Sequence, residues 1–166
     1  MSLRRSHLLT VCALAVAFAA GGLLPSAFAD TSAAPTVVRN ALAQTGAVQG
    51  APNRTMVLSR VRVEPGTQLA THHHLGTQIS RVTAGVLTYT VRKGKAEVRR
   101  GEADQNPELV RTIKAGQTAR IRAGEWLVEQ PSDIHEAANR GGTPVVIYLA
   151  TLLESGAPPA TPVTLP

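Results

Sequence analysis

The sequence has 166 residues, of which 17 are Lys or Arg, 11 are Asp or Glu and one is Cys, and its formal net charge is +6 at pH 7. This length supports one domain and is too short for two domains with separate cores. A single Cys12 excludes a disulfide scaffold, and the lack of long basic runs or of an aromatic-basic platform argues against nucleic acid as a partner.

Residues 1–29 have the pattern of an export signal peptide. Arg4-Arg5 forms a basic start, residues 6–29 contain no Asp, Glu, Lys or Arg, and Ala27-Phe28-Ala29 matches the A-x-A cleavage pattern. We expect cleavage before Asp30 and an exported protein, periplasmic or extracellular, with no thiol. The segment could instead be retained as a membrane anchor, and only then do we expect a membrane partner. The general and the twin-arginine export routes both stay open.

The remaining chain divides into three parts. Residues 30–53 are rich in Ala, Thr, Pro, Gly and Gln, which predicts an extended N-terminal segment with room for one edge strand. Residues 54–152 are assigned to one β domain, and residues 153–166 to a proline-rich, irregular C-terminal tail. Because barrel edges outside the core can pair with a second copy, we expect a homodimer.

Nine short strands are predicted in the central domain, because apolar and alternating runs are separated there by Gly and Pro. The expected strands are Met56–Val63, Thr77–Val82, Val86–Arg92, Lys95–Arg99, Leu109–Ile113, Thr118–Arg122, Trp126–Gln130, Ile134–Ala138 and Val145–Leu153. No stretch after the signal peptide keeps a helical periodicity. The pattern is typical of an all-β sandwich or barrel.

Four histidines remain after the signal peptide, at only two places in the chain. In a strand, residues i and i+2 face the same side, so His72 and His74 converge while His73 points away. Gln78 shares the parity of His74 if the strand resumes after a bend, and a hairpin-rich barrel could return His135 to the same place. Neutral imidazole is the commonest metal ligand in proteins, so this spacing favours a metal site over scattered surface histidines.

These histidines lie within two longer motifs. The pattern G-x5-H-x-H-x3-4-E-x6-G is matched in every spacing, with Gln in place of Glu, by Gly66, His72, His74, Gln78 and Gly85. The pattern G-x5-P-x-G-x2-H-x3-N is matched in part by Gly124, Pro131, Asp133, His135 and Asn139, with Asp133 in place of the second glycine. The gap before Pro131 is one residue too long and the gap after it one too short, so the distance from Gly124 to His135 is preserved. On these motifs residues 54–152 resemble the cupin superfamily.

The resemblance implies an all-β, single-domain antiparallel β-barrel of the double-stranded jelly-roll type, with one divalent metal ion inside. Carried over position by position, the metal ligands are His72, His74, Gln78 and His135, and the ion is Fe, Mn, Ni, Cu or Zn. Three imidazoles and a neutral amide would leave the whole +2 charge of such an ion uncompensated.

The function that the resemblance implies stays open between two classes. Three or four protein ligands leave open positions on a metal ion, as catalysis requires. The first class is a metal-dependent enzyme acting on a small organic molecule, such as a dioxygenase-like oxidoreductase, an isomerase, a decarboxylase or a cyclase. The alternative is a non-catalytic cupin that binds a metal or a small ligand. No catalytic residue is singled out, because Asp133 and Glu136 are expected to be turn and outward-facing charges, and Tyr89 and Trp126 ordinary core residues.

Overall fold

The fold is built from antiparallel β-strands. A computed structural model describes residues 36–101 and 106–165, and these contain no helix, hence none that could cross a membrane. The predicted signal peptide lies outside the described residues. The strands are β1 (Val37–Thr45), β2 (Arg54–Val63), β3 (Gln68–His73), β4 (Gly76–Ala84), β5 (Val86–Lys93), β6 (Lys95–Arg100), β7 (Glu108–Lys114), β8 (Thr118–Arg122), β9 (Glu125–Glu129), β10 (Ile134–Ala138), β11 (Val145–Glu154) and β12 (Thr161–Pro162).

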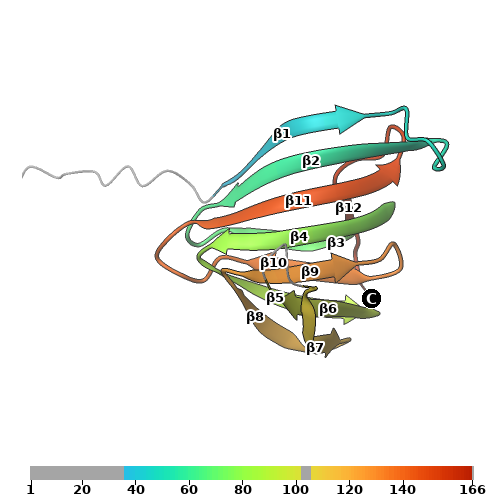
Figure 1. The fold of residues 1–166 in the computed structure, drawn as a ribbon. Helices are drawn as coiled ribbons and strands as arrows, with labels where there is room; N and C mark the ends of the chain where they lie inside the picture. Colours follow the sequence, from blue (N-terminus) through green and yellow to red (C-terminus); the bar gives the residue numbers. More distant parts are fainter. Residues whose placement is uncertain (1–35, 102–105, 166) are drawn as a thin grey trace, which may run out of the picture. The chain divides into compact units, whose positions relative to one another are not determined.

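Two sheets make up the fold (Figure 1). The larger has the strand order β1-β2-β11-β4-β9-β6-β7, and the smaller has the order β12-β3-β10-β5-β8. Successive side chains of a strand face opposite sides, so each strand turns one face toward the interior between the sheets. That interior is filled mainly by Val, Leu and Ile from both sheets, among them Val63 of β2, Val91 of β5 and Ile121 of β8. This is the all-β jelly roll expected from the sequence, formed by two separate sheets.

The nine strands predicted from alternation are all present, with ends that differ by at most two residues from the predicted ones. β1 falls within residues 30–53 and forms one edge of the larger sheet. Alternation does not predict β3, whose sequence is mostly polar, or β12, which has two residues. β12 exists through its pairing with β3, where Thr161 lies opposite His73 and Pro162 opposite His72. The predicted irregular tail therefore contains a short strand.

Two glycines shape the turns that bring the strands of the site together. Gly85 connects β4 of the larger sheet to β5 of the smaller one at φ +75°, where a Cβ would lie 2.7 Å from the carbonyl oxygen of Pro144. Gly94 connects β5 to β6 at φ +79°, where a Cβ would collide with the carboxylate of Asp133. Only glycine meets both demands without strain. Asp133 also accepts hydrogen bonds from the backbone N–H groups of Lys95 and Gln130, which is the turn role expected for it.

Candidate metal centre

Three histidines from two neighbouring strands meet inside the fold. β3 pairs with β10 so that His72 lies opposite His135, and His74 follows directly after the end of β3. All three side chains are buried, whereas His73 between them is only half-buried. Successive side chains of a strand face opposite sides, so His73 points away from the cluster, as predicted from the sequence.

The imidazole rings are close enough to bind one ion. The ring centroids lie 4.9 Å apart for His72 and His74, 4.4 Å for His72 and His135, and 5.1 Å for His74 and His135. One ring nitrogen from each lies within 4.8 Å of the others, so the three could hold a metal ion together. The Nε2 atoms of His74 and His135 are 3.3 Å apart, and at most one of them can carry a proton toward the other.

Two of the rings are oriented by backbone carbonyl groups. The Nδ1–H of His72 donates to the carbonyl oxygen of Ala70 at 2.6 Å, and that of His74 donates to the carbonyl oxygen of Pro159 at 2.8 Å. Because a carbonyl can only accept, Nδ1 carries the proton and Nε2 keeps its lone pair for a ligand. Pro159 belongs to the C-terminal tail, which therefore supports the site directly.

Burial keeps two of these imidazoles neutral. Loss of hydration lowers the pKa of His74 to about 4; the charge of Glu129 opposes this shift, and His135 and His72 add to it. Loss of hydration, followed by the neighbouring His72, lowers the pKa of His135 to about 3. Both rings are deprotonated at neutral pH, which is the state that binds metal.

A buried carboxylate that the sequence did not point to lies beside the histidines. Glu129, on β9, accepts a hydrogen bond from the hydroxyl of Tyr89 at 2.6 Å and one from the side-chain amide of Gln78 at 2.7 Å. Its oxygens lie 3.4 Å from Nε2 of His135 and 3.9 Å from Nε2 of His74. Glu129 thus places a negative charge beside the imidazoles, next to the neutral Gln78 that the sequence analysis expects as a ligand.

Gln78 and Tyr89 hold this carboxylate in place. Gln78 lies directly opposite Glu129 in the pairing of β4 with β9. Its amide N–H donates to Glu129, so only Oε1 remains as a metal donor, and this buried atom has no hydrogen-bond partner within the described structure. Tyr89 is buried, as a core residue should be, but its ring also stacks on His135 with centroids 5.0 Å apart. Burial, followed by the charge of Glu129, raises the pKa of Tyr89 well above its ordinary value, so the phenol stays a donor.

Trp126 and Glu136 lie away from the cluster. Glu136 faces outward, as predicted, where it pairs with Arg92 at 2.6 Å. Trp126 is half-buried on the opposite side of β9, its indole N–H donates to the carbonyl oxygen of Gly101, and the guanidinium of Arg81 lies 5.0 Å from its ring centroid. It is not the core residue that we expected.

The residues of the cluster fit a divalent transition-metal ion. The available donors are three imidazole nitrogens, the carboxylate of Glu129 and the carbonyl oxygen of Gln78. Imidazole donors favour first-row transition metals and zinc over Mg²⁺ and Ca²⁺, which prefer oxygen. The partnerless Oε1 of Gln78 and Nδ1 of His135 are buried polar atoms of the kind that a bound ion, ligand or water would satisfy.

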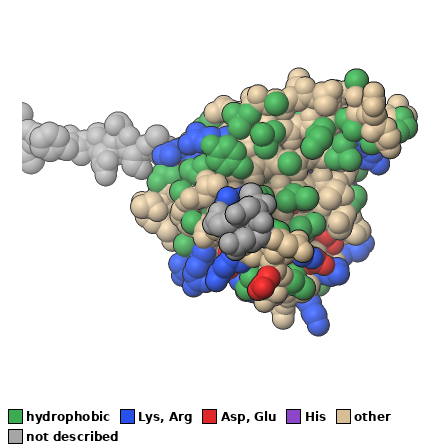
Figure 2. Space-filling model, viewed as in Figure 1, with side chains coloured by type: hydrophobic (Ala, Val, Ile, Leu, Met, Phe, Trp, Pro, Cys, Tyr) green, Lys and Arg blue, Asp and Glu red, His purple; other side chains and the backbone are tan. Residues whose placement is uncertain are grey.

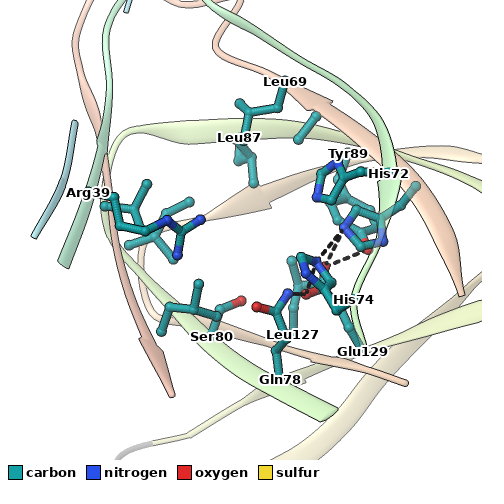
Figure 3. Close-up of a pocket in the computed structure, with 15 residues that line it drawn as sticks. Arg39, Leu69, His72, His74, Gln78, Ser80, Leu87, Tyr89, Leu127 and Glu129 are labelled. Atoms are coloured by element: carbon teal, nitrogen blue, oxygen red, sulfur yellow. Dashed lines mark hydrogen bonds and ion pairs between the residues drawn. The ribbon is translucent and has the colours of Figure 1, made fainter. Parts of the chain in front are cut away.

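A small cavity adjoins the histidines (Figure 3). Its volume is about 60 Å³, which is room for roughly four to six water molecules. Leu69, Leu87 and Leu127 form apolar walls, and polar groups reach it from Arg39 and Ser80. The site is thus a group of metal-type donors beside a largely apolar space for a small molecule.

The fold resembles that of solved cupin structures. A cupin 2 domain-containing protein from Halorhodospira halophila matches with a TM-score of 0.50 at 15% identity, over 77% of this chain and 70% of that chain. A cupin 2 conserved barrel domain protein from Salinispora arenicola matches with a TM-score of 0.47 at 15% identity, over 69% and 74% of the two chains. An oxalate oxidase in complex with the substrate analogue glycolate matches with a TM-score of 0.45 at 22% identity, over 74% and 53%.

Sequence comparison adds nothing to this likeness, since no known family model and no curated protein matches the chain. The likeness to the Halorhodospira structure agrees with the two facing antiparallel sheets and with the cupin-like motifs that carry the histidines. The chain has the fold of the cupin superfamily.

Proposed function

We propose that this protein is an exported cupin that binds one divalent transition-metal ion through His72, His74 and His135 and acts on a small organic molecule beside that ion. The observation that carries the proposal is the convergence of three buried imidazoles on one point. Two of them have their Nδ1 atoms engaged by carbonyl groups, so Nε2 is left for a metal. Export is proposed from the composition of residues 1–29 alone.

The fourth position of the ligand set belongs to Gln78, Glu129 or both. Gln78 can offer only its carbonyl oxygen, because its N–H is donated to Glu129. Glu129 has both oxygens near the histidines and would reduce the net charge of a bound dication. Negative charge close to a buried cation lowers the cost of burying that cation.

The surroundings of the cluster suit chemistry on a small molecule. A bound ion would supply Lewis-acid or redox chemistry there. Glu129 can accept a proton from a molecule in the cavity, and the hydrogen bonds from Tyr89 and Gln78 keep its carboxylate in position. Leucine side chains supply apolar walls against which the carbon atoms of such a molecule can pack. A dioxygenase-like oxidoreductase and an isomerase are both compatible with these groups.

The alternative is a non-catalytic cupin that holds a metal or a small ligand. It is favoured by the number of donors, because three imidazoles, one carboxylate and one amide oxygen could fill the coordination sphere of a single ion. Azide binding to the metal-loaded protein separates the two functions. The protein is loaded with Co²⁺ or Cu²⁺ for this test, because Zn²⁺ gives no visible spectrum. A changed visible spectrum on azide addition would show an open coordination position and support the enzyme, whereas an unchanged spectrum would support the binding protein.

Elemental analysis of the purified protein, before and after dialysis against a chelator, tests the metal site. We expect one equivalent of a transition metal in the wild type and in His73→Ala, and little in His72→Ala, His74→Ala or His135→Ala. His73→Ala is a matched control because it removes a neighbouring imidazole that faces away from the cluster. A wild type that takes up no metal, or a His73→Ala variant as empty as His72→Ala, would contradict the proposal.

N-terminal sequencing of protein from the native host tests export. The sequence should begin at Asp30, and a retained N-terminus in the membrane fraction would contradict it.

A further inference from the structure

The cavity beside the histidines has a cationic side chain on its far wall. Arg39 of β1 lies opposite Val61 of β2, and Val61 is a buried core residue. Residues directly opposite each other in an antiparallel pair share a face of the sheet, so Arg39 is turned toward the interior. Its guanidinium projects into the cavity across from the labelled His72 and His74 (Figure 3).

Among the described residues, none pairs directly with the Arg39 guanidinium. No hydrogen bond or ion pair joins Arg39 to another residue within 36–101 or 106–165. Burial lowers the pKa of Arg39, and the charge of Glu129 opposes that effect, yet an arginine remains protonated under all ordinary conditions. A partly buried charge without a hydrogen-bonded partner is costly, so the position favours a ligand that supplies the missing anion.

The shape and polarity of the cavity limit what this anion can be. Ser80 and Gln78 lie along one side between Arg39 and the histidines, and leucine side chains form other walls (Figure 3). A volume of about 60 Å³ admits only a small molecule. A carboxylate matches the planar guanidinium with two parallel hydrogen bonds. In the metal-free protein a phosphate group is less suitable, because its second negative charge would have no cationic partner in the cavity and Glu129 already adds negative charge.

We propose that Arg39 is the anion-binding residue of this cavity and that its ligand is a small monocarboxylic acid, with the carboxylate on Arg39 and the remainder of the molecule directed toward the histidines. The inference names a substrate class and so rests on the proposed function for its chemistry. The pairing with Arg39 does not require the metal, because Arg39 and the histidines occupy opposite sides of the cavity.

Calorimetric titration with pyruvate and acetate, and with the neutral amides pyruvamide and acetamide, tests this pairing. The proteins are the wild type, Arg39→Gln, Arg39→Lys and the control Arg60→Gln, each measured with and without metal. Arg60 lies opposite Tyr148, on the outer face of the same sheet, so the control removes an equal charge outside the cavity. We expect the wild type and Arg60→Gln to bind pyruvate equally and Arg39→Gln to bind it at least ~10-fold more weakly, with no binding of the amides.

Three results would overturn the inference: no carboxylate binding to the wild type, equal binding of acid and amide, or unchanged affinity in Arg39→Gln. A lower melting temperature of that variant together with unchanged affinity would indicate a purely structural role. If Arg39→Gln fails to fold, the Arg39→Lys variant tests the inference instead. Lysine keeps the positive charge but lacks the planar guanidinium group, so this variant should bind pyruvate more weakly than the wild type does. Metal analysis of the same samples separates this inference from the metal site. Arg39-dependent binding in a protein that takes up no metal would refute only the proposed function.

Discussion

Among the single residues of the site, Glu129 lies beside Gln78, the position where the cupin motif has Glu. The two side chains are hydrogen-bonded at 2.7 Å, on neighbouring strands. The site therefore has an amide and a carboxylate where the family pattern has one carboxylate. We therefore expect the metal affinity to depend on Glu129, a residue outside the two cupin-like motifs.

We predict that Glu129→Gln weakens metal binding by about 1–3 kcal/mol, because the substitution is nearly isosteric and removes the negative charge beside the ion. The measurement is a chelator competition titration. Gln78→Glu is a second variant that tests the same pair of side chains. It places a second carboxylate against Glu129, so the metal-free protein should melt at a lower temperature and gain more stability from added metal than the wild type does. Equal affinities in all three proteins would show that neither side chain contributes to the site.

The depressed pKa values of His74 and His135 predict how the metal-free protein responds to acid. Both rings are neutral in the folded state, with pKa values of about 4 and 3, and become protonated below about pH 6.5 when the chain unfolds. Their contribution to stability is present above pH 6.5 and is lost as the pH falls toward 4 and 3. With up to two protons taken up on unfolding, the free energy of unfolding should fall by at most about 2.7 kcal/mol per pH unit in this window. Urea titrations from pH 7 to pH 4 measure this slope, and a flat profile would contradict it.

At the scale of strands, Glu125 at the start of β9 holds four strands together. It is 0% exposed and accepts hydrogen bonds from Arg111 of β7 at 2.9 Å, from Arg100 of β6 at 2.7 Å and from the backbone N–H of Arg122 in β8 at 2.9 Å. The hydrogen bond from Arg111 is the main cause that lowers the pKa of Glu125 to about 2. This network fastens the edge of the larger sheet to the smaller one.

We predict that Glu125→Gln lowers the free energy of unfolding at pH 7 by about 2–3 kcal/mol. Because the folded pKa is depressed, this stabilisation is present above the pKa of the unfolded chain, about 4.5, and is lost as the pH falls toward 2. Glu97→Gln is the matched control, since Glu97 forms a solvent-accessible ion pair with Arg99 on the neighbouring β6 and should matter little. Urea unfolding at pH 7 and pH 3 measures both variants. Equal losses in the two would contradict the role of Glu125.

The C-terminal tail supports the histidine cluster from outside the central domain. β12 pairs with β3, the backbone N–H of Val163 donates to Thr71 at 3.0 Å, and the carbonyl of Pro159 orients His74. We predict that a chain ending at Gly156 keeps its strand content by circular dichroism but binds metal at least ~10-fold more weakly, because His74 loses its orienting acceptor. A chain ending at Val163 is the control. Unchanged affinity in the shorter chain would show that the tail is dispensable for the site.

At the scale of the whole molecule, the outer face of the larger sheet exposes several large apolar side chains. Met56 and Leu58 of β2, Ile79 of β4 and Tyr148 of β11 are each at least 40% exposed. Leu58 and Ile79 both lie opposite Ala150 of β11, so they occupy the same face. Hydrophobic side chains are visible over this part of the surface (Figure 2). Grouped apolar residues on a sheet face are typical of a surface that another molecule covers.

We predict a homodimer that buries this face. Light scattering should give twice the mass of the chain for the wild type, and Leu58→Lys with Ile79→Lys should give a monomer, because two charges would be buried in each copy of a self-complementary interface. The pair Thr118→Lys and Gln117→Lys, in and beside β8 of the other sheet, controls for added charge. A monomeric wild type would contradict the prediction.

The fold could be predicted largely from local patterns. Alternating apolar residues and turn glycines identified nine strands to within two residues, since both signals depend on neighbours in the chain. Strand parity separated His73 from His72 and His74 for the same reason. Alternation did not predict β3 or β12, because their sequences carry none. β3 is a strand through its pairing with the distant β10, and β12 through its pairing with β3.

Local sequence patterns are enough to predict an all-β cupin-like domain with histidines at metal-binding spacing. The other groups around these histidines come from distant parts of the chain and become visible only in the folded protein. Glu129 could have been suspected, because it shares the parity of the apolar Leu127 in a predicted strand, but its contact with Gln78 spans 51 residues of sequence. The carbonyl of Pro159 reaches His74 across 85 residues. Arg39 faces the cavity because β1 pairs with β2 in one register, and a shift of one residue would turn it to solvent. Such relations depend on strand register and sheet order, which local sequence does not encode.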